Sequence, residues 1–328
     1  MLDKQKQSEM ELGAGQVKVK ISHVLVSNYD AYIYSGDKKI SYPKTIGRFA
    51  IGIVTETGAN GYGLKKGSRV YMKAIRPCEK CFACKSGDRA NCTSPKAAVS
   101  DFDGFLRDFV VCDYDDVSLI PDSISDMHAL CIESVALAEN IFDNLHLSTG
   151  GKVAIVGAGF IGSILTQVAL YHKLTPIVID NHPQNIERMQ KSGAFFTFAA
   201  DDSLVSNVNN ATSGTLCDAA IYTSCCKLSP SVAASVLARG KNLVLGGFTT
   251  LNFNMDATPI FEKNLKVYGV SDGYGYIETA INMLVHGALD LNNFEKEVLK
   301  DFNPADLLSE RAKNAPFTSK MTVLKLIM

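Results

Sequence analysis

The fold of this chain is decided by residues 152–162, Lys152-Val-Ala-Ile-Val-Gly157-Ala-Gly159-Phe-Ile-Gly162. A short apolar run rich in β-branched residues ends on a glycine, as a buried parallel strand does. Residues 163–171 then have the apolar spacing of a helix. In the spacing Gly157-x-Gly159-x-x-Gly162, the first glycine permits a tight turn, the second lets the backbone approach a pyrophosphate, and the third lets helix and strand pack closely. The N–H groups that begin the helix would face the anion.

A second strand follows at residues 175–180 and ends in an acid, Asp180. Asp180 lies 18 residues after Gly162, close to the ~20 expected for the carboxylate that binds the adenosine ribose. Its charge would repel a 2′-phosphate, which predicts NAD(H) rather than NADP(H). The predicted cofactor-binding residues are Gly157, Gly159, Phe160, Ile161, Gly162 and Asp180. The alternative is a glycine-rich turn that binds no ligand.

The composition sets limits on the rest of the chain. Its 328 residues are enough for two domains, and 46% of them are hydrophobic. The 33 Lys and Arg against 34 Asp and Glu leave a net charge of −1, unlike the basic footprint of a nucleic-acid binder. The first ten residues are polar, and no apolar run reaches the ~18 residues of a membrane span. We therefore expect a cytoplasmic protein without nucleic-acid or membrane partners.

Four of the nine cysteines lie close together at the spacing C-x2-C-x2-C-x7-C, as Cys78, Cys81, Cys84 and Cys92. Two-residue gaps let successive thiolates converge on one ion, and a fourth thiolate from the returning chain completes a tetrahedron. A zinc ion with no open position is structural, so the spacing predicts one structural zinc. The alternative is a chance cluster of reduced thiols.

Short β-rich stretches with glycine turns precede the glycine motif and predict a barrel-like first domain. Strands are expected within residues 16–30 (ending in a polar turn), 47–57, 66–72 and 102–112, followed by a helix over 127–143. After the motif, alternating elements predict a doubly wound parallel sheet. Its strands are expected near 153–156, 176–179, 195–198, 218–222, 242–246 and 265–270, with a helix over 274–288 and a β-rich tail over 317–327.

Together these features resemble the medium-chain dehydrogenase/reductase superfamily of zinc alcohol and polyol dehydrogenases. The resemblance implies an α/β fold: a β-rich GroES-like catalytic domain (1–125 and 272–328, with the zinc lobe at 76–94) and an NAD-binding Rossmann domain (126–271). It implies hydride transfer between nicotinamide and a small alcohol, polyol or carbonyl compound. Ile132-Glu133-Ser134 is most similar to the polyol and sugar-alcohol branch.

The sequence departs from the family pattern where the catalytic zinc would bind. The family's Cys-Gly-(Ser/Thr)-Asp-x-His corresponds to residues 27–32, Ser-Asn-Tyr-Asp-Ala-Tyr, and its Gly-His-Glu corresponds to Gly47-Arg48-Phe49. A serine hydroxyl is a poor ligand, and a guanidinium has no lone pair to offer. Of the ligand positions only Glu133 keeps a metal-binding side chain, so we expect the catalytic zinc to be absent.

The predicted catalytic residues are therefore Ser27, Tyr29, Arg48 and Glu133. Arg48 would place a positive charge where the metal would polarise a carbonyl, or it would bind an anionic substrate group. Tyr29 occupies the place of the proton-relay hydroxyl. Three alternatives remain open: Arg48 pairs with Glu133 in a site that has lost its chemistry, the chain binds NAD(H) without turnover, or it is an ordinary zinc-dependent alcohol dehydrogenase with other ligands.

The late strand at residues 264–270 is expected at the edge of the parallel sheet. An uncovered apolar edge favours pairing across a two-fold axis, and in the resembling family this strand makes that contact. The chain is predicted to form a homodimer or homotetramer.

Overall fold

The glycine-motif stretch forms the centre of a six-stranded parallel sheet, as the alternating pattern predicts. The computed structural model describes residues 11–59, 63–223, 228–247, 254–314 and 320–326. Its parallel sheet has the order β10-β9-β8-β11-β12-β13. The strands are β8 (Lys152–Val156), β9 (Thr175–Ile179), β10 (Phe196–Phe198), β11 (Cys217–Thr223), β12 (Leu237–Gly246) and β13 (Lys266–Val270). The strand order reverses beside β8, which is where folds of this kind bind their ligands.

Alternate residues of β8 face opposite sides of the sheet, and each side has its own core. Val153 and Ile155 belong to one apolar cluster, whereas Ala154 and Val156 belong to another. This is the two-residue period of a strand buried on both faces. The helices of this half are α5 (Phe160–Tyr171), α6 (Pro183–Lys191), α7 (Leu204–Ala211), α8 (Pro230–Ser235) and α9 (Thr258–Glu262).

The other half is built on a seven-stranded mixed sheet with the order β14-β15-β1-β2-β3-β7, in which β6 also pairs with β1. Its strands are β1 (Gln16–Val26), β2 (Phe49–Thr57), β3 (Arg69–Met72), β6 (Phe109–Asp113), β7 (Val117–Leu119), β14 (Lys296–Leu299) and β15 (Met321–Lys325). Strand β15 pairs with β1, so the C-terminal tail returns to the N-terminal half. Residues 317–319 and 327 of the predicted tail strand lie outside the described residues.

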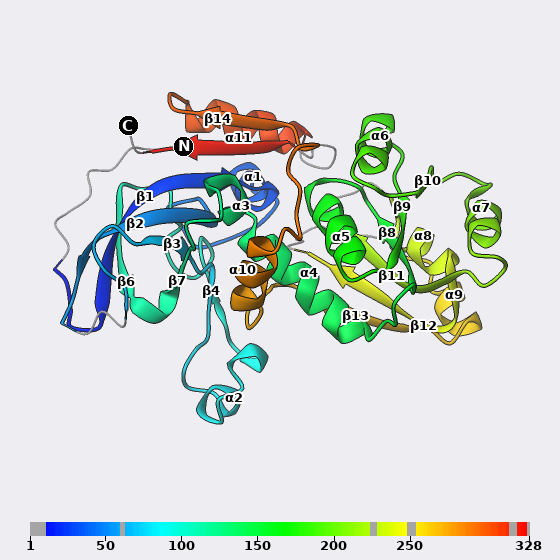
Figure 1. Cartoon of the computed structure of the whole chain (residues 1–328), viewed down its shortest axis with the longest axis horizontal. Coiled ribbons are helices and arrows are strands. Elements are labelled where there is room, and N and C mark those ends of the chain that lie inside the picture. Colours follow the sequence, from blue (N-terminus) through cyan, green and yellow to red (C-terminus); the bar gives the residue numbers. More distant parts are fainter. Residues whose placement is uncertain (1–10, 60–62, 224–227, 248–253, 315–319, 327–328) are drawn as a thin grey trace.

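The two halves share one continuous core. Helices α4 (Ile132–Leu145) and α10 (Ile277–Val285) lie between the sheets in Figure 1. The apolar cluster around them includes Phe49 and Tyr71 from the mixed sheet as well as Ile155 from the parallel sheet. A group on α4 is therefore fixed relative to both sheets, and Glu133 lies in the first turn of this helix.

The polar stretch after β1 is a helix, α1 (Asn28–Ser35), and not the turn that the sequence predicted. Ser27 and Asp30 form a reciprocal capping box at its start, the pattern that satisfies the free N–H groups of a first turn. The predicted helix over 127–143 is divided into α3 (Asp126–Ala129) and α4. The predicted strand over 66–72 begins only at Arg69, because residues 65–68 close a turn through a Ser68 N–H to Lys65 carbonyl bond.

The four-cysteine segment forms a lobe that projects from the mixed-sheet half at the bottom of Figure 1. It contains α2 (Phe82–Lys85) and the 3-10 helix η1 (Arg89–Asn91), and the short strands β4 (Ile75–Arg76) and β5 (Lys96–Ala97) join it to the domain. The remaining elements are η2 (Tyr114–Asp116) and α11 (Pro304–Asn314).

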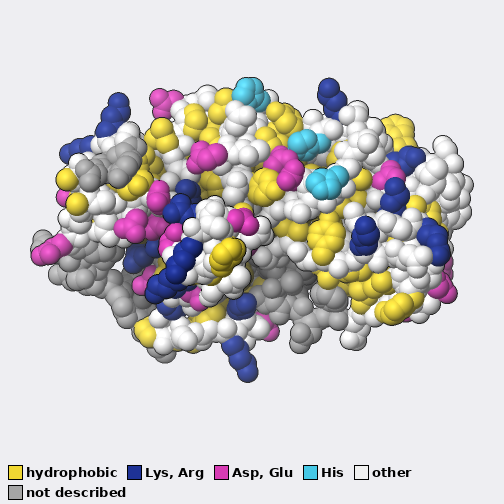
Figure 2. Space-filling view, turned by 90° about the horizontal axis from the view of Figure 1, so that it is seen from below, with side chains coloured by type: hydrophobic (Ala, Val, Ile, Leu, Met, Phe, Trp, Pro, Cys, Tyr) yellow, Lys and Arg dark blue, Asp and Glu magenta, His cyan; other side chains and the backbone are white. Residues whose placement is uncertain are grey.

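Charges of both signs are interspersed on the face shown in Figure 2, without a continuous basic patch. This distribution agrees with the net charge of −1. In the part of the chain that the structure describes, no helix has the length and apolar character needed to cross a membrane.

Candidate functional site

The glycine turn after β8 has the backbone geometry that the motif predicts. Gly157 has a φ of 99°, in the left-handed region that side chains rarely adopt. A Cβ on Gly162 would lie 1.9 Å from the carbonyl oxygen of Gly157, so no other residue fits there. Helix α5 begins directly after Gly159, and no side chain of the described residues caps it. Its first N–H groups therefore lack intrahelical acceptors, as an anion-binding helix start requires.

Side chains from both neighbouring strands hold this turn. Thr223, at the end of β11, donates its hydroxyl to the carbonyl oxygens of Val156 (3.0 Å) and Gly157 (3.2 Å). Asp180, directly after β9, accepts the N–H of Ala158 at 2.7 Å. Thr223 was not among the predicted residues, and only its place at the end of a parallel strand could have indicated it.

Asp180, which the sequence predicts to bind the adenosine ribose, lies beside the glycine turn, and its carboxylate already has protein donors. Besides Ala158, it accepts the N–H of His182 at 2.7 Å and the side-chain amide of Asn185 at 3.2 Å. Only 5% of Asp180 is exposed. A carboxylate has about four acceptor positions, so this arrangement leaves room for a ribose hydroxyl while fixing the orientation of the group.

Arg48 is buried, with 3% of its surface exposed, in a cluster of charged and aromatic side chains. Its guanidinium carbon lies 5.0 Å from the centre of the Tyr29 ring and 5.7 Å from that of Phe49, within the range of cation–π attraction. Burial raises the pKa of Glu133, and the positive charge of Arg48 lowers it in turn. The predicted group of Tyr29, Arg48 and Glu133 is therefore brought together.

Glu133 is held by a second aromatic residue, Tyr71 on β3. The Tyr71 hydroxyl donates to Glu133 Oε2 at 2.5 Å. Burial, followed by the charge of Glu133, raises the pKa of Tyr71 well above its usual value. Among the described residues, Glu133 Oε1 is buried without a hydrogen-bond partner. Tyr71 was not predicted, because only the tertiary fold places β3 beside the first turn of α4.

Asp30 is a further buried acid of this cluster, and Ser27 donates two hydrogen bonds to it. The backbone N–H and hydroxyl of Ser27 donate to Asp30 at 3.0 and 2.6 Å, and the N–H of Gly47 donates at 2.8 Å. Burial raises the pKa of Asp30, whereas these hydrogen bonds and the charge of Arg48 lower it. Ser27 therefore caps α1 and orients Asp30, an acid that the sequence motif contained but the predicted site omitted.

The Tyr29 hydroxyl forms a hydrogen bond with Ser100 Oγ. The Lys38 ammonium also lies 5.6 Å from the Tyr29 ring centre, so two cations flank this ring. Ser100 is half-buried and was not predicted, since no motif surrounds it. Tyr32, which like Tyr29 belongs to α1, is buried, with 4% of its surface exposed.

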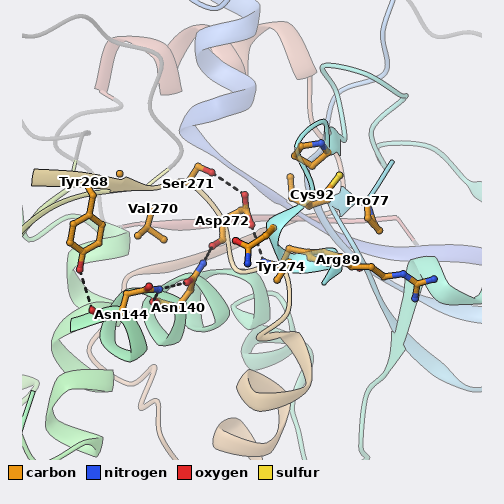
Figure 3. Close-up of a pocket in the computed structure, with 15 residues that line it drawn as sticks. Pro77, Arg89, Cys92, Asn140, Asn144, Tyr268, Val270, Ser271, Asp272 and Tyr274 are labelled. Carbon is orange, nitrogen blue, oxygen red and sulfur yellow. Dashed lines mark hydrogen bonds between the residues drawn. The ribbon is translucent and has the colours of Figure 1, made fainter. Parts of the chain in front are cut away.

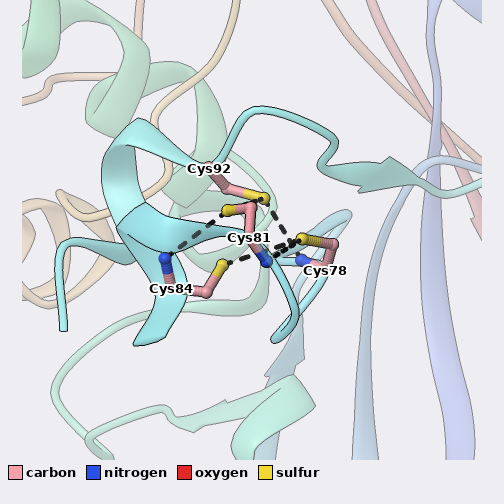
Figure 4. Close-up of side chains that lie close together, drawn as sticks. All are labelled: Cys78, Cys81, Cys84 and Cys92. Atoms are coloured by element: carbon pink, nitrogen blue, oxygen red, sulfur yellow. Dashed lines mark hydrogen bonds between the residues drawn. The ribbon is translucent and has the colours of Figure 1, made fainter. Parts of the chain in front are cut away.

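The four predicted cysteines converge in the lobe, as Figure 4 shows, with their sulfur atoms all within 4.8 Å of one another. The Cys78 and Cys84 sulfurs are 3.9 Å apart, and those of Cys81 and Cys92 are 4.0 Å apart. Tetrahedral zinc with bonds of about 2.3 Å would hold its sulfur ligands roughly 3.8 Å apart. These two distances are close to that spacing, and four sulfur ligands are a set that structural zinc prefers.

Backbone N–H groups in the lobe point at the sulfur atoms. The N–H of Cys84 donates to the Cys81 sulfur at 3.5 Å, and this bond is the main cause that lowers the pKa of Cys81 to about 5. Such bonds favour the thiolates that bind metal. Within the described ranges, these cysteines are the one group of three or more His, Cys, Asp or Glu side chains placed to hold a metal, and Glu133 belongs to no such group.

A polar hollow of about 430 Å³ lies between the lobe, α4 and strand β13, as Figure 3 shows. Asn140 donates to the carbonyl of Asp272 at 2.8 Å, and Tyr268 donates to the carbonyl of Asn144 at 3.4 Å. Cys92 is the only predicted site residue among its lining residues. The hollow borders the edge of the parallel sheet and not the glycine turn.

Comparison with known proteins gives two family matches that together cover most of the chain. Residues 13–122 match the alcohol dehydrogenase GroES-like domain, and residues 161–286 match the zinc-binding dehydrogenase family. The starvation-sensing protein RspB of Escherichia coli is 28% identical over 184 residues, which are 55% of this chain and 54% of that protein. A sorbitol dehydrogenase of Halalkalibacterium halodurans is 24% identical over 81% of this chain and 79% of its own length.

Solved structures share the fold. Galactitol-1-phosphate dehydrogenase from Escherichia coli superposes with a TM-score of 0.84 at 20% identity, covering 98% of this chain and 96% of its own. An Escherichia coli protein described as the short chain alcohol dehydrogenase rspB, complexed with NADH, has a TM-score of 0.81 at 21% identity, covering 98% and 94%.

Because the cysteine cluster leaves no open position, we expect about one zinc ion per chain that supports folding. Replacing Cys92 with Ser should remove the metal and lower the melting temperature, because three thiolates cannot close the tetrahedron. Elemental analysis of the zinc content and thermal unfolding test this. Cys112→Ala is the control, since Cys112 is a buried cysteine outside the cluster. Native protein purified without chelator that contained no zinc, or that held these cysteines as disulfides, would contradict the assignment.

Proposed function

The chain belongs to the medium-chain, zinc-type alcohol and polyol dehydrogenase family, and from this we propose that it transfers a hydride between NAD(H) and a small alcohol, polyol or carbonyl compound without a catalytic zinc. The family makes it an NAD(P)-dependent oxidoreductase. The observation that carries the finer proposal is the buried Arg48, whose positive charge acts on Glu133. Both residues stand at positions where the family would place its metal ligands.

The glycine turn would hold the diphosphate of the cofactor, and Asp180 its adenosine ribose. When bound, the nicotinamide ring supplies or accepts the hydride. The NADH complex of the structural relative supports this choice of cofactor. The names of two further relatives, sorbitol dehydrogenase and D-xylulose reductase, support a polyol or its ketone as substrate.

Arg48 would stabilise the negative charge that develops on the substrate oxygen. A guanidinium donates charge-assisted hydrogen bonds to an oxyanion. If the cation is already in position before the reaction, little free energy is needed to reorganise the site. On the protein side, Arg48 interacts with two buried acids, since its charge lowers the pKa of both Asp30 and Glu133. Tyr29, hydrogen-bonded to the half-buried Ser100, would relay the hydroxyl proton of the substrate through Ser100 to solvent during oxidation, and in the reverse direction during reduction.

A catalytic zinc would need three protein ligands with available lone pairs. Glu133 offers one, but the Ser27 hydroxyl donates to Asp30 and Arg48 is a cation. These residues do not fit a metal, and the proposal derives no step through one. The zinc of the four-cysteine lobe would be structural, because its ligand set is closed.

Arg48→Ala should lower kcat/KM about 100-fold, the scale for losing one oxyanion donor. The substrate is first found by following NADH absorbance over a panel of polyols, alcohols and their carbonyl forms. NADH affinity should be unchanged, because the glycine turn lies on another sheet, and Arg48→Lys should retain part of the activity. Full activity in Arg48→Ala would refute the role of Arg48. A well-occupied metal beside Glu133 would favour an ordinary zinc-dependent enzyme, and no turnover of any substrate would favour a non-catalytic NAD(H)-binding protein.

The cofactor preference should depend on Asp180. Asp180→Gly should weaken NADH binding and bring the NADH and NADPH dissociation constants closer together, because the carboxylate no longer contacts the ribose or repels a 2′-phosphate. Fluorescence titration of both cofactors measures the effect. Asp201→Gly, an exposed acid on the same half, serves as the control. Equal affinity of the native protein for the two cofactors would count against the assignment.

We further propose that the chain forms a dimer through β13. This strand is an edge of the parallel sheet, and Val267 on it is 37% exposed. The polar hollow beside the strand could receive loops of a second copy. Val267→Asp should shift the protein to a monomer, because the like charges of the two copies would lie close together where the edge strands pair, whereas Val205→Asp on α7 should not. Light scattering at micromolar concentration measures the mass, and a monomeric native protein would refute the idea.

A further inference from the structure

Arg188 on α6 contacts the glycine turn, although no part of the sequence motif includes it. One amino group of its guanidinium donates to the carbonyl oxygen of Ala158 and to Ser163 Oγ, the latter at 3.3 Å. The other donates to Asn185 Oδ1 at 2.9 Å. The side chain therefore joins α6 to the turn and to the first residues of α5.

These contacts close a ring around Ala158, the second residue of the glycine motif. Asp180 accepts the N–H of Ala158 at 2.7 Å, and Arg188 donates to its carbonyl oxygen. Asn185 completes the ring, because its side chain donates to Asp180 at 3.2 Å and accepts from Arg188 at 2.9 Å. Both polar groups of one peptide residue are thus held by charged side chains.

Arg188 also places a positive charge beside Asp180. Burial lowers the pKa of Arg188 to about 10, and the charge of Asp180 acts in the opposite direction. The guanidinium therefore stays charged at neutral pH. The negative charge of Asp180 and the positive charge of Arg188 therefore partly cancel each other's electric field at the point where an adenosine ribose would lie.

We propose that Arg188 is a positioning residue for the adenosine half of the dinucleotide and moderates the discrimination that Asp180 exerts against a 2′-phosphate. The inference rests on the proposed function, in that the ligand of the glycine turn is NAD(H). By holding the carbonyl of Ala158, Arg188 keeps the turn in the conformation that directs its N–H groups at the diphosphate. By offsetting the charge of Asp180, it reduces repulsion of a phosphorylated ribose.

The test is a set of binding titrations on the full chain with its zinc. Arg188→Gln should weaken NADH binding about tenfold, the effect of losing one charged hydrogen bond. It should weaken NADPH binding by roughly a further tenfold, because the charge of Asp180 is then uncompensated. Arg188→Lys keeps the charge but loses the planar guanidinium that donates to several acceptors at once. It should therefore weaken the binding of both cofactors alike and leave the ratio of their dissociation constants at the native value.

Glu187→Gln is the matched control, since Glu187 is an exposed neighbour on α6 that pairs only with Lys191 among the described residues. It should change neither dissociation constant. A purely structural role for Arg188 predicts a lower melting temperature with an unchanged ratio of the NADPH and NADH constants in Arg188→Gln, and that result would overturn the inference. If Arg188→Gln does not fold, a changed ratio in Arg188→Lys overturns it instead.

The proposed function fails in a different way. Native protein that bound neither dinucleotide would refute the proposed cofactor and this inference with it, before any variant is made. Native protein that bound NADH tightly, with Arg188→Gln unchanged in both constants, would refute only the role of Arg188.

Discussion

The close contact between Gly162 and the carbonyl oxygen of Gly157 is the constraint on which the parallel-sheet half depends. A side chain there would lie 1.9 Å from that oxygen, so α5 can pack against β8 only with glycine at this point. Because helix and strand are so close, α5 starts at the end of β8, and its first N–H groups have no acceptor within the helix. Residues at the ends of the neighbouring strands then meet at the same turn, which is why Asp180 and Thr223 both contact it.

A second constraint is the burial of charge in the mixed-sheet half. Removing an ion from water costs several kcal/mol unless other charges and hydrogen bonds compensate it. Arg48 is compensated by two acids, Asp30 and Glu133, and these acids have their own donors in Ser27, Gly47 and Tyr71. The arginine is therefore fixed in advance of any substrate. This is the property that makes a cation useful for stabilising developing charge.

The cysteine lobe is a separate, local feature of the mixed-sheet half. Its four sulfurs converge within one short segment, so a metal there would be bound by local sequence and would not depend on how the two sheets pack. The lobe also forms one wall of the hollow beside β13. Folding of the lobe would therefore shape the surface that we assign to a second copy.

The sequence by itself determined the features that depend on local spacing. The order of glycines, the alternation of strands with helices and the cysteine gaps predicted the turn, the parallel sheet and the cluster. Each of these follows from neighbours in the chain, since backbone conformation and ligand convergence over a few residues leave little freedom.

Only the tertiary structure decided which distant side chains meet. Tyr71 reaches Glu133, Ser100 reaches Tyr29 and Arg188 reaches Ala158 across long stretches of chain. Asp30 likewise accepts the backbone N–H of Gly47, 17 residues further along the chain. Such contacts depend on the packing of separate elements, and a hydrogen bond between residues far apart in sequence leaves no periodic pattern in either segment.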